Sequence, residues 1–201
     1  MKLYYTPGAC SLSPHIVALE AELPLELIKV DLQTKLTEHG EDFKKINPNG
    51  YVPTLILDDG NRLTEGTAIV QYLADRAPEK KLAPEASTFE RYLLQQWLNF
   101  VSTEIHKNFS PLFDPSAQQA AKDSAIERLS SRLETVEEHL SDKPFLLGKT
   151  FSAADAYLFV TLSWRHYVNL DISRWPALTR YAEGISERPA VQQALKEEGL
   201  I

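Results

Sequence analysis

The chain contains a single cysteine, Cys10, among its 201 residues. One cysteine cannot form an internal disulfide, and it excludes metal sites built from several cysteines. Long hydrophobic runs are also missing, since no stretch approaches the roughly 18 apolar residues of a membrane span. The chain has fewer basic than acidic side chains, 21 Lys and Arg against 28 Asp and Glu. This balance disfavours binding to nucleic acid or anionic lipid. Because the N-terminal residues lack the apolar core of a signal peptide, we expect a cytoplasmic protein.

The first part of the chain alternates between strand and helix patterns. Strand patterns cover residues 2–6 and 25–32, and residues 51–65 read as a hairpin that turns at Asp59-Gly60. Helical patterns cover residues 11–23, 41–46 and 66–76. This alternation predicts an α/β domain.

Only helical patterns follow residue 87. They cover residues 88–112, 117–141, 153–168, 177–187 and 190–198. The preceding residues 77–87 contain two prolines and little apolar periodicity, which is typical of a linker. We therefore predict two domains, an α/β domain over residues 1–80 and an all-α domain over residues 87–201.

Cys10 follows a Pro-Gly turn and precedes the first helical pattern. A thiol at the first turn of a helix lies near unpaired N–H groups and the positive end of the helix dipole, and both favour the thiolate. The spacing Cys10-Ser-Leu-Ser13 resembles a Cys-x-x-Cys motif without its second cysteine, so a disulfide can form only with an external thiol. A small buried hydrophobic role for Cys10 stays open. His15 is expected to be structural.

Two further segments of the first domain present backbone groups to a possible ligand. Pro53 follows the turn-rich NPNG and is a candidate for a cis peptide bond, which would leave Val52 unpaired in the sheet and able to bind a peptide-like ligand. Glu65 and Gly66 precede a helix whose N–H groups can hold a carboxylate, while Glu65 can hold an ammonium group. An ordinary turn and an ordinary acidic first turn are the respective alternatives.

In the helical half, Asn99, Thr103 and His106 are spaced i, i+4 and i+7 and share one helix face. Spacing alone favours a solvated surface for this face. The run FSAADAYLF begins with a capping-box pattern, in which Ser152 caps the helix and Asp155 bonds back to it. This pattern is expected to stabilise a core helix.

Four of these features occur together across essentially the whole chain: Cys10 after Tyr-Thr-Pro-Gly-Ala, the Val52-Pro53 step, Glu65-Gly66 before AIVQYLAD, and FSAADAYLF. In this combination the sequence resembles the glutathione S-transferases and is most similar to the bacterial beta class. The resemblance implies a thioredoxin-like N-terminal domain with a mixed four-stranded sheet and an all-helical C-terminal domain. It further implies homodimers, glutathione as co-substrate in a cleft between the domains, and no metal.

The resemblance also implies roles for individual residues of the first domain. Cys10 meets the glutathione sulfur and can form a mixed disulfide with it. Val52 pairs with the cysteinyl backbone of glutathione, and Lys35 meets a carboxylate. Glu65 and Gly66 hold the γ-glutamyl end. Gly66 stands where many members have serine, so a hydroxyl contact is lost while the N–H remains.

In the helical domain the resemblance turns the Asn99 face toward the cleft. The glutathione-binding residues implied there are Asn99, Thr103, Glu104 and His106. His106 is expected to donate to the sulfur or to shift its proton balance, with a pKa near physiological pH. The expected pocket for the second substrate is lined by Phe109, Phe113, Tyr157 and Trp164, with ordinary core packing as the alternative.

Three functions are consistent with this sequence. The first is conjugation of the glutathione thiol to small hydrophobic electrophiles, driven by an ionised sulfur and by proximity. The second is glutathione-dependent disulfide reduction with Cys10 as nucleophile, and the third is non-catalytic ligand binding or assembly on the same fold. Tyr5 and Ser11 match positions of catalytic hydroxyls in other classes, so the dominant activating group among Cys10, Tyr5, Ser11 and His106 stays open.

Overall fold

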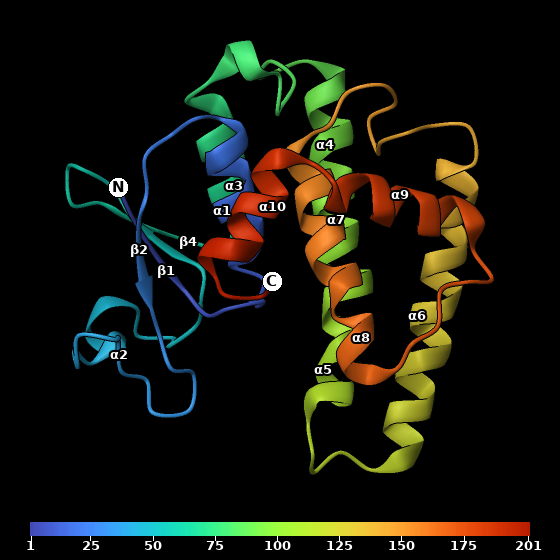
Figure 1. Cartoon of the computed structure of the whole chain (residues 1–201), viewed down its shortest axis with the longest axis horizontal. Coiled ribbons are helices and arrows are strands. Elements are labelled where there is room, and N and C mark those ends of the chain that lie inside the picture. The colour runs from blue at the N-terminus through green and yellow to red at the C-terminus, as the bar shows by residue number, and fades with distance from the viewer. The chain divides into compact units, whose positions relative to one another are not determined.

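The computed structural model describes all 201 residues, Met1–Ile201, and divides into two compact units. The first unit comprises Met1–Ala83 and Arg188–Ile201, and the second comprises Pro84–Glu187. Figure 1 follows the chain from β1 (blue) to α10 (red). No helix in the chain combines the length and the apolar character needed to cross a membrane.

The first unit is built on a four-stranded sheet in the order β2-β1-β3-β4. Its strands are β1 (Lys2–Tyr5), β2 (Glu26–Lys29), β3 (Thr54–Ile56) and β4 (Arg62–Thr64). β1 pairs in parallel with β2 and antiparallel with β3, and β3 pairs antiparallel with β4. A parallel pair needs a crossover connection, which α1 (Leu12–Glu20) supplies. The expected mixed four-stranded sheet is confirmed.

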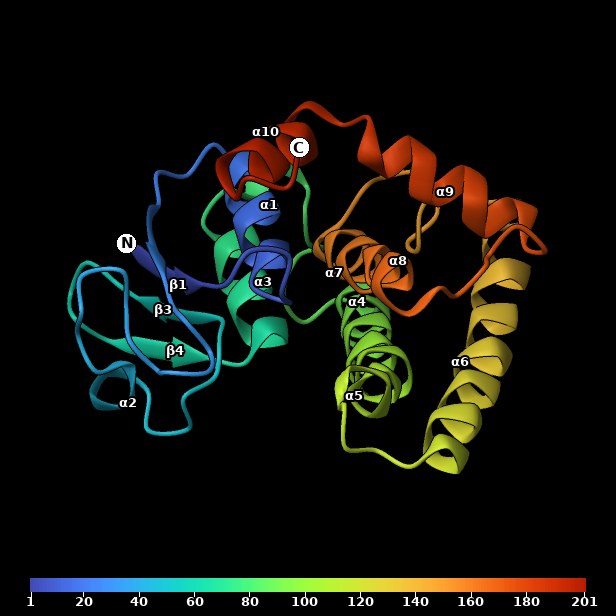
Figure 2. The ribbon, with the colours of Figure 1, turned by 60° about the horizontal axis from the view of Figure 1, so that its bottom comes forward.

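Successive side chains of β1 point to opposite faces of this sheet, and they are buried on both faces. Tyr4 joins Ile28 and Phe43 in one apolar cluster, and the Tyr4 and Phe43 rings are 5.5 Å apart. Phe43 comes from the short helix α2 (Phe43–Ile46). Leu3 points to the opposite face, because successive side chains of a strand alternate, and it is fully buried. α1 and α3 (Gly66–Asp75) lie on the side of the sheet away from α2, as Figure 2 shows.

Helix α10 (Pro189–Glu197) belongs to the first unit although it comes last in the sequence. It packs on α1, beside which it lies in Figure 2. Arg188 donates two hydrogen bonds to the Glu20 carboxylate, at 2.6 and 2.9 Å. The sequence prediction assigned residues 87–201 to the helical domain, whereas the compact units place Arg188–Ile201 with the sheet. No local pattern encodes this docking, because its partners lie far apart in the sequence.

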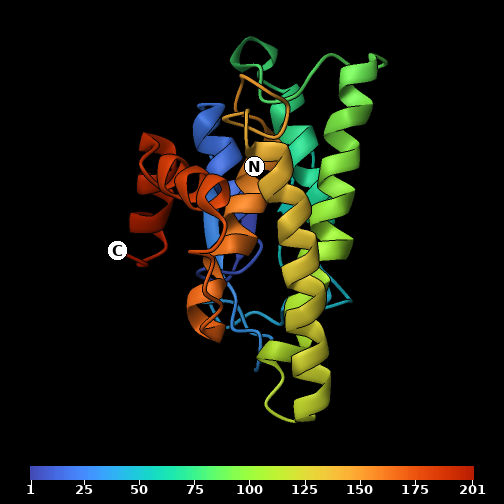
Figure 3. The same ribbon diagram turned by 90° about the vertical axis from the view of Figure 1, so that its right-hand side faces the viewer.

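The second unit is entirely helical. Its elements are α4 (Phe89–Phe100), η2 (Val101–His106), α5 (Lys107–Phe113), α6 (Gln119–Leu140), α7 (Ala153–Ser163), α8 (Arg165–Val168) and α9 (Pro176–Ser186). Figure 3 shows the long helix α6 in yellow. The backbone N–H groups of Ala177 and Leu178 donate to the Glu137 carboxylate at 3.1 and 2.7 Å, which fastens the start of α9 to the end of α6.

Two of the expected helices are interrupted. The helix expected over residues 88–112 passes through η2, a π-helical segment of six residues, between α4 and α5. The helix expected over residues 153–168 ends as α7 at Ser163 and resumes as α8 at Arg165. A π-helical turn and an α-helical turn contain different numbers of residues. The side chains that follow η2 therefore point in different directions from those of an uninterrupted α-helix.

The expected capping box at the start of α7 is confirmed. The fully buried Asp155 accepts hydrogen bonds from the Ser152 N–H at 2.9 Å and the Ser152 hydroxyl at 2.7 Å. It also accepts from the Leu146 N–H at 2.8 Å and the Tyr181 hydroxyl at 3.0 Å. These hydrogen bonds satisfy the buried carboxylate, whose pKa is raised by burial. Through them Asp155 links three segments of the second unit.

Candidate active site

Cys10 lies in the loop between β1 and α1, one residue before the N-cap Ser11. Its side chain is partly exposed, and its Sγ lies 3.4 Å from the carbonyl oxygen of Val52. The Ser11 hydroxyl bonds the Thr6 N–H at 3.1 Å and the Thr6 carbonyl at 3.2 Å. The Ser13 hydroxyl donates to the Cys10 carbonyl at 2.8 Å. Side chains on both sides of the cysteine therefore hold its loop in place.

The two hydroxyl groups that the sequence left as alternatives are both buried. Ser11 is fully buried, and its hydroxyl is committed to the Thr6 backbone. Burial raises the pKa of Tyr5, and the charge of Glu198 raises it further. A raised pKa makes the phenolate harder to form. The Ser11 hydroxyl is therefore held by the Thr6 backbone, and burial disfavours the phenolate form of Tyr5.

The Val52–Pro53 peptide bond is cis, as the sequence suggested. Val52 precedes β3, and its N–H donates to no group of the chain. The buried Asn47 holds this loop from inside, because its Nδ2 donates to the Tyr51 carbonyl at 2.9 Å and to the Thr54 hydroxyl at 3.0 Å. Val52 thus presents its backbone from a supported loop.

Glu65 occupies the N-cap of α3 with φ of 66° and ψ of 113°. Non-glycine residues rarely adopt positive φ, and such conformations cost about 1–3 kcal/mol and cluster at functional sites. The Glu65 side chain is exposed and makes no capping bond. The first backbone bonds of this turn run from the Ala68 and Ile69 N–H groups to the Glu65 carbonyl. The N–H groups of Gly66 and Thr67 therefore point out of the helix end without a partner.

The remaining predicted residues of the first unit lie against the same loop. The Lys35 Nζ donates to the Gly50 carbonyl at 3.0 Å and lies 5.9 Å from the centre of the Tyr51 ring. A Cβ added to Gly66 would lie 3.6 Å from Pro53 Cγ, so the loop contacts the start of α3. Residues 47–53, which we call the Val52 loop, thus contain Val52 and contact Cys10, Lys35 and Gly66, while Glu65 directly precedes Gly66 in the chain.

His15 forms a buried ionic cluster with the end of α10. Its ring Nδ1 lies 3.0 Å from a Glu198 carboxylate oxygen, and its Nε2 lies 2.8 Å from Glu197. The other Glu198 oxygen accepts from the Gly8 N–H at 2.9 Å, two residues before Cys10. Burial works to lower the pKa of His15, but the hydrogen bonds to the two carboxylates outweigh it and the pKa is raised. The expected structural role of His15 agrees with these contacts.

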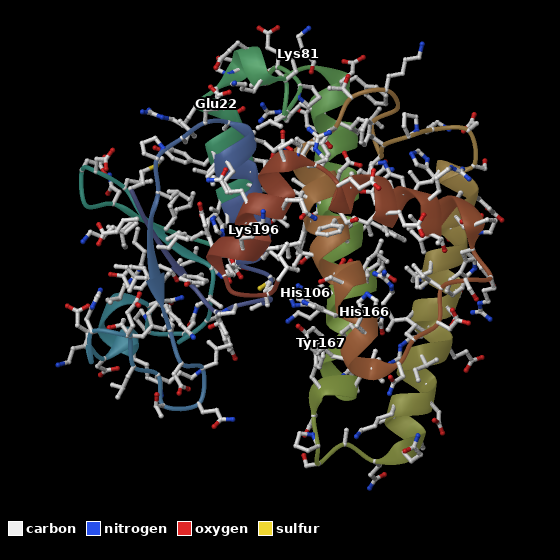
Figure 4. The ribbon with its side chains drawn as sticks, viewed as in Figure 1. Glu22, Lys81, His106, His166, Tyr167 and Lys196 are labelled. Carbon is white, nitrogen blue, oxygen red and sulfur yellow. The ribbon has the colours of Figure 1, made fainter.

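His106 ends η2 in the second unit, where Figure 4 labels it together with His166 and Tyr167 of α8. Its Nδ1 lies 2.6 Å from the Tyr157 hydroxyl, and its ring centre lies 4.7 Å from that of Trp164, edge to face. Burial, with a smaller contribution from Lys107, lowers the pKa of His106 to about 4. The expectation of a pKa near physiological pH is therefore wrong, because no carboxylate faces the ring to offset its burial.

The other predicted residues of this helix differ in their contacts. Asn99 and Thr103 are exposed, and the Thr103 hydroxyl donates to the Asn99 carbonyl at 3.1 Å. Glu104 instead forms an ion pair with the Arg132 Nε at 2.7 Å. Asn99 and Thr103 are thus adjacent on the helix, as their spacing predicted, whereas the Glu104 carboxylate is already occupied.

The four aromatic residues expected to line a second-substrate pocket do lie together. Trp164 is central, with ring centres 5.5 Å from Phe109, 5.7 Å from Phe113 and 4.7 Å from His106. We call His106, Phe109, Phe113, Tyr157 and Trp164 the aromatic cluster. Phe109, Tyr157 and Trp164 are buried, whereas Phe113 is 47% exposed. Most of the cluster is therefore core, Phe113 is its most exposed member, and His106 is partly exposed.

A separate groove of about 440 Å³ lies between α4 and α6. Its lining residues are Gln96, Trp97, Phe100, Thr135, Glu138 and His139. None of them belongs to the predicted site. No three or more His, Cys, Asp or Glu side chains are arranged to hold a metal ion.

Both parts of this chain match families of known proteins. The family profile for the glutathione S-transferase N-terminal domain matches residues 8–76, and the profile for the C-terminal domain matches residues 119–184. The chain is 44% identical to glutathione S-transferase GstA of Escherichia coli O157:H7, over the full length of both. This chain belongs to the glutathione S-transferase family.

Two solved structures of such transferases are similar to this chain in both sequence and fold. The bacterial transferase BphK, solved as a ternary complex, is 55% identical with a TM-score of 0.98, over 99% of this chain and all of that one. A bacterial beta class transferase of Sphingomonas chungbukensis is 46% identical with a TM-score of 0.97, over the full length of both. The resemblance to the beta class and the fold expected from it are therefore confirmed.

Sequence reasoning missed three features of this transferase. The support of the Val52 loop by Asn47 had a signal in the turn motif NPNG, which begins at that residue. The contact of Glu198 with the Cys10 loop had none, because 190 residues separate Glu198 from Gly8. The hydrogen bond between Tyr157 and His106 also had no signal in the sequence, although both residues were predicted to belong to the site.

Proposed function

We propose that this transferase binds glutathione along the Val52 loop and conjugates its thiol to small hydrophobic electrophiles. The observation that carries the proposal is the Cys10 Sγ at 3.4 Å from the Val52 carbonyl, beside a Val52 N–H that has no partner. A tripeptide that pairs its cysteinyl N–H and C=O with Val52 lies alongside this loop like an added strand. Its sulfur then lies next to Cys10.

The charged ends of glutathione have complementary groups in the first unit. The exposed Glu65 carboxylate suits the ammonium of the γ-glutamyl end, and the N–H groups of Gly66 and Thr67 suit its carboxylate. The Lys35 ammonium, held at the Gly50 carbonyl, suits the remaining carboxylate. Each charge of the ligand thereby meets an opposite charge or an unpaired donor.

The resemblance to the family supports the addition of residues of the second unit to the proposed site. Asn99 and Thr103 contribute polar contacts to glutathione, and His106 donates to its sulfur. Glu104 contributes least, since Arg132 already holds its carboxylate. The aromatic cluster receives the electrophile at Phe113, which is the exposed member.

In this function the glutathione thiol loses its proton to solvent and the thiolate attacks an electrophilic carbon. A carbon–sulfur bond forms while the bond to the leaving group breaks, and the leaving group departs with the electron pair. Proximity and a stabilised thiolate account for the acceleration.

A second function, disulfide exchange, is favoured by the partial exposure of Cys10. The Cys10 thiolate attacks a glutathione-containing disulfide, so that a mixed disulfide forms and the other sulfur leaves as thiolate. A glutathione thiolate then attacks the mixed disulfide and regenerates Cys10. No internal cysteine competes, because the chain has only one.

Replacing Cys10 separates the two functions. With Cys10→Ala we expect thiol–disulfide exchange to fall at least about 100-fold, because the nucleophile is gone, while conjugation of 1-chloro-2,4-dinitrobenzene changes no more than about threefold. Cys10→Ser is the matched control, since it keeps the size of the side chain. If both activities survive in both variants, the role proposed for Cys10 is wrong. Failure of the wild-type protein to bind immobilised glutathione would remove the proposal altogether and favour a non-catalytic function.

The proposal includes a cytoplasmic homodimer. It is supported by the family resemblance and by two exposed aromatic side chains near the start of α4, Phe89 and Tyr92, which are 71% and 60% exposed. Large exposed apolar side chains are often covered by a partner. Light scattering at micromolar concentration tests the dimer, and a monomer mass would refute it.

A further inference from the structure

The hydrogen bond between His106 and Tyr157 joins two helical elements of the second unit, η2 and α7. Its length of 2.6 Å is at the short end of the range for hydrogen bonds in proteins. The Trp164 ring lies edge to face against the imidazole and restricts its rotation. The bond therefore fixes both the position of the ring and which of its nitrogens faces Tyr157.

The protonation state of His106 follows from its surroundings. Burial and the nearby Lys107 lower its pKa to about 4, so the ring is neutral at pH 7 and carries one proton on either Nδ1 or Nε2. A neutral imidazole nitrogen accepts hydrogen bonds better than a phenol oxygen does. The phenol is also the better proton donor of the two, with an ordinary pKa near 10. The Tyr157 hydroxyl therefore donates to Nδ1, and the ring proton resides on Nε2.

The Nε2 atom has no hydrogen-bond partner in the chain, because the only polar contact of the His106 ring is the one to Tyr157. A histidine whose Nδ1 is occupied and whose Nε2–H is unpaired is a hydrogen-bond donor. It is not arranged as a base, since its one basic nitrogen already accepts from a hydroxyl.

We propose that Tyr157 is a positioning residue that holds His106 in its Nε2–H form, so that His106 donates a hydrogen bond to the thiolate of glutathione. The donation to sulfur rests on the proposed function, whereas the position of the ring proton rests on contacts within the second unit alone. The other form would direct a lone pair at the anionic sulfur and repel it. His106 keeps its proton throughout, and the proton of the glutathione thiol leaves to solvent.

The position of the ring proton is tested first, by ¹⁵N NMR of the histidine side chains in the intact protein at pH 7. The chain has five histidines, and the His106 signals are identified by their loss in His106→Gln. His139 is an internal reference for the same form, because its Nε2 lies 2.8 Å from the Leu146 carbonyl, which can only accept. We expect a protonated Nε2 for His106, and a mixture of both forms in Tyr157→Phe. A proton on Nδ1, or an unchanged spectrum in Tyr157→Phe, would overturn the inference.

The catalytic consequence is tested by a double-mutant cycle on kcat/KM for conjugation. Tyr157→Phe is expected to lower kcat/KM about tenfold in the wild-type background and to have little effect in His106→Gln, because its action passes through His106. His106→Gln retains a side-chain N–H near the Nε2 position and is expected to keep more activity than His106→Ala. An equal loss from Tyr157→Phe in both backgrounds would show a merely structural role and refute the proposal.

Tyr181→Phe is the matched control. Tyr181 is another buried tyrosine of the second unit, and its hydroxyl donates to Asp155 rather than to His106. Tyr181→Phe is expected to lower stability without changing the NMR spectrum of His106 or the result of the double-mutant cycle. A changed His106 spectrum would count against a positioning role specific to Tyr157.

The two experiments also separate this inference from the proposed function. If the His106 proton is on Nε2 but neither His106→Ala nor Tyr157→Phe lowers kcat/KM, the contact of His106 with the sulfur is refuted. If the proton is on Nδ1 and His106→Ala still lowers kcat/KM, the positioning role of Tyr157 is refuted and the proposed function stands.

Discussion

His15 in the first unit and His106 in the second are both largely buried, yet their pKa values move in opposite directions. Two carboxylates, Glu197 and Glu198, hydrogen-bond His15 and raise its pKa although burial opposes them. His106 has a hydroxyl and an aromatic ring as neighbours, so burial dominates and lowers its pKa to about 4. The same side chain is thus part of an ionic cluster in one unit and a neutral ring in the other.

The difference shows that burial keeps a histidine neutral unless carboxylate partners outweigh it. In the proposed function it also gives the two histidines different roles. The ionic cluster around His15 supports the loop that carries Cys10, through the Glu198 contact with Gly8. The neutral His106 has the role, in the proposed function, of offering its one N–H to glutathione. Two of the three predictions below test this contrast, and the third tests the start of α3 in the first unit.

The largest expected effect comes from breaking the ionic cluster. Glu198→Ala removes the acceptor of both His15 and the Gly8 N–H, and it leaves a buried imidazole with one carboxylate fewer. Removing one partner of a buried ion pair costs roughly 3–5 kcal/mol, so we expect a loss of that order in the free energy of unfolding. Urea denaturation at pH 6 measures it.

Glu197→Ala is the control for this experiment. The Glu197 side chain is 39% exposed while that of Glu198 is fully buried, so water can replace its contact with His15. We expect a loss of about 1 kcal/mol or less. Equal losses in the two variants would mean that burial does not distinguish the carboxylates.

The second prediction concerns stability against pH. The folded protein binds a proton at His106 less readily than the unfolded chain, so this residue destabilises the fold as pH falls from about 6.5 to about 4, by about 3 kcal/mol in total. His15 has the opposite sign, because its raised pKa gives stability that is complete below about 6.5 and is lost as pH rises through the folded value.

Unfolding free energies of wild type, His106→Gln and His15→Gln, measured from pH 4 to 8, separate the two contributions. The stability of wild type relative to His106→Gln should decrease toward pH 4. Relative to His15→Gln it should decrease toward pH 8. Parallel curves for the three proteins would contradict the opposite shifts.

The smallest expected effect concerns Gly66. A Cβ at this position meets Pro53 at 3.6 Å, which is ordinary contact, so serine fits without rearrangement. Gly66→Ser adds a hydroxyl beside the unpaired N–H groups, and we expect the KM for glutathione to fall about threefold, as one added hydrogen bond allows. Gly66→Ala isolates the hydroxyl, because it adds the Cβ alone. A KM that falls equally in both variants would assign the gain to the helix rather than to the hydroxyl.

Local patterns predicted much of the first unit correctly. The Pro-Gly turn before Cys10, the Asp59-Gly60 hairpin and the apolar face of α3 each depend on residues close in sequence, so spacing alone located them. The capping box of α7 was predictable for the same reason, since Ser152 and Asp155 are three residues apart.

Patterns failed where a contact joined distant segments. The assignment of α10 to the helical half and the pKa expected for His106 both depended on neighbours that the sequence does not display. The π-helical segment η2 was missed because the buried residues within it, Val101 and Ile105, fit ordinary helical spacing.

The sequence by itself determined the order of the elements, the family and the set of chemical groups, because these follow from short-range spacing and residue type. The tertiary structure decided the environment of each group. Glu198 reaches the Cys10 loop and Tyr157 reaches His106 only after the chain has folded, because 190 and 51 residues separate these partners. Hydrogen bonding and the charge of a buried side chain act over a few ångströms, so only the folded chain sets which groups are ionised and which can donate.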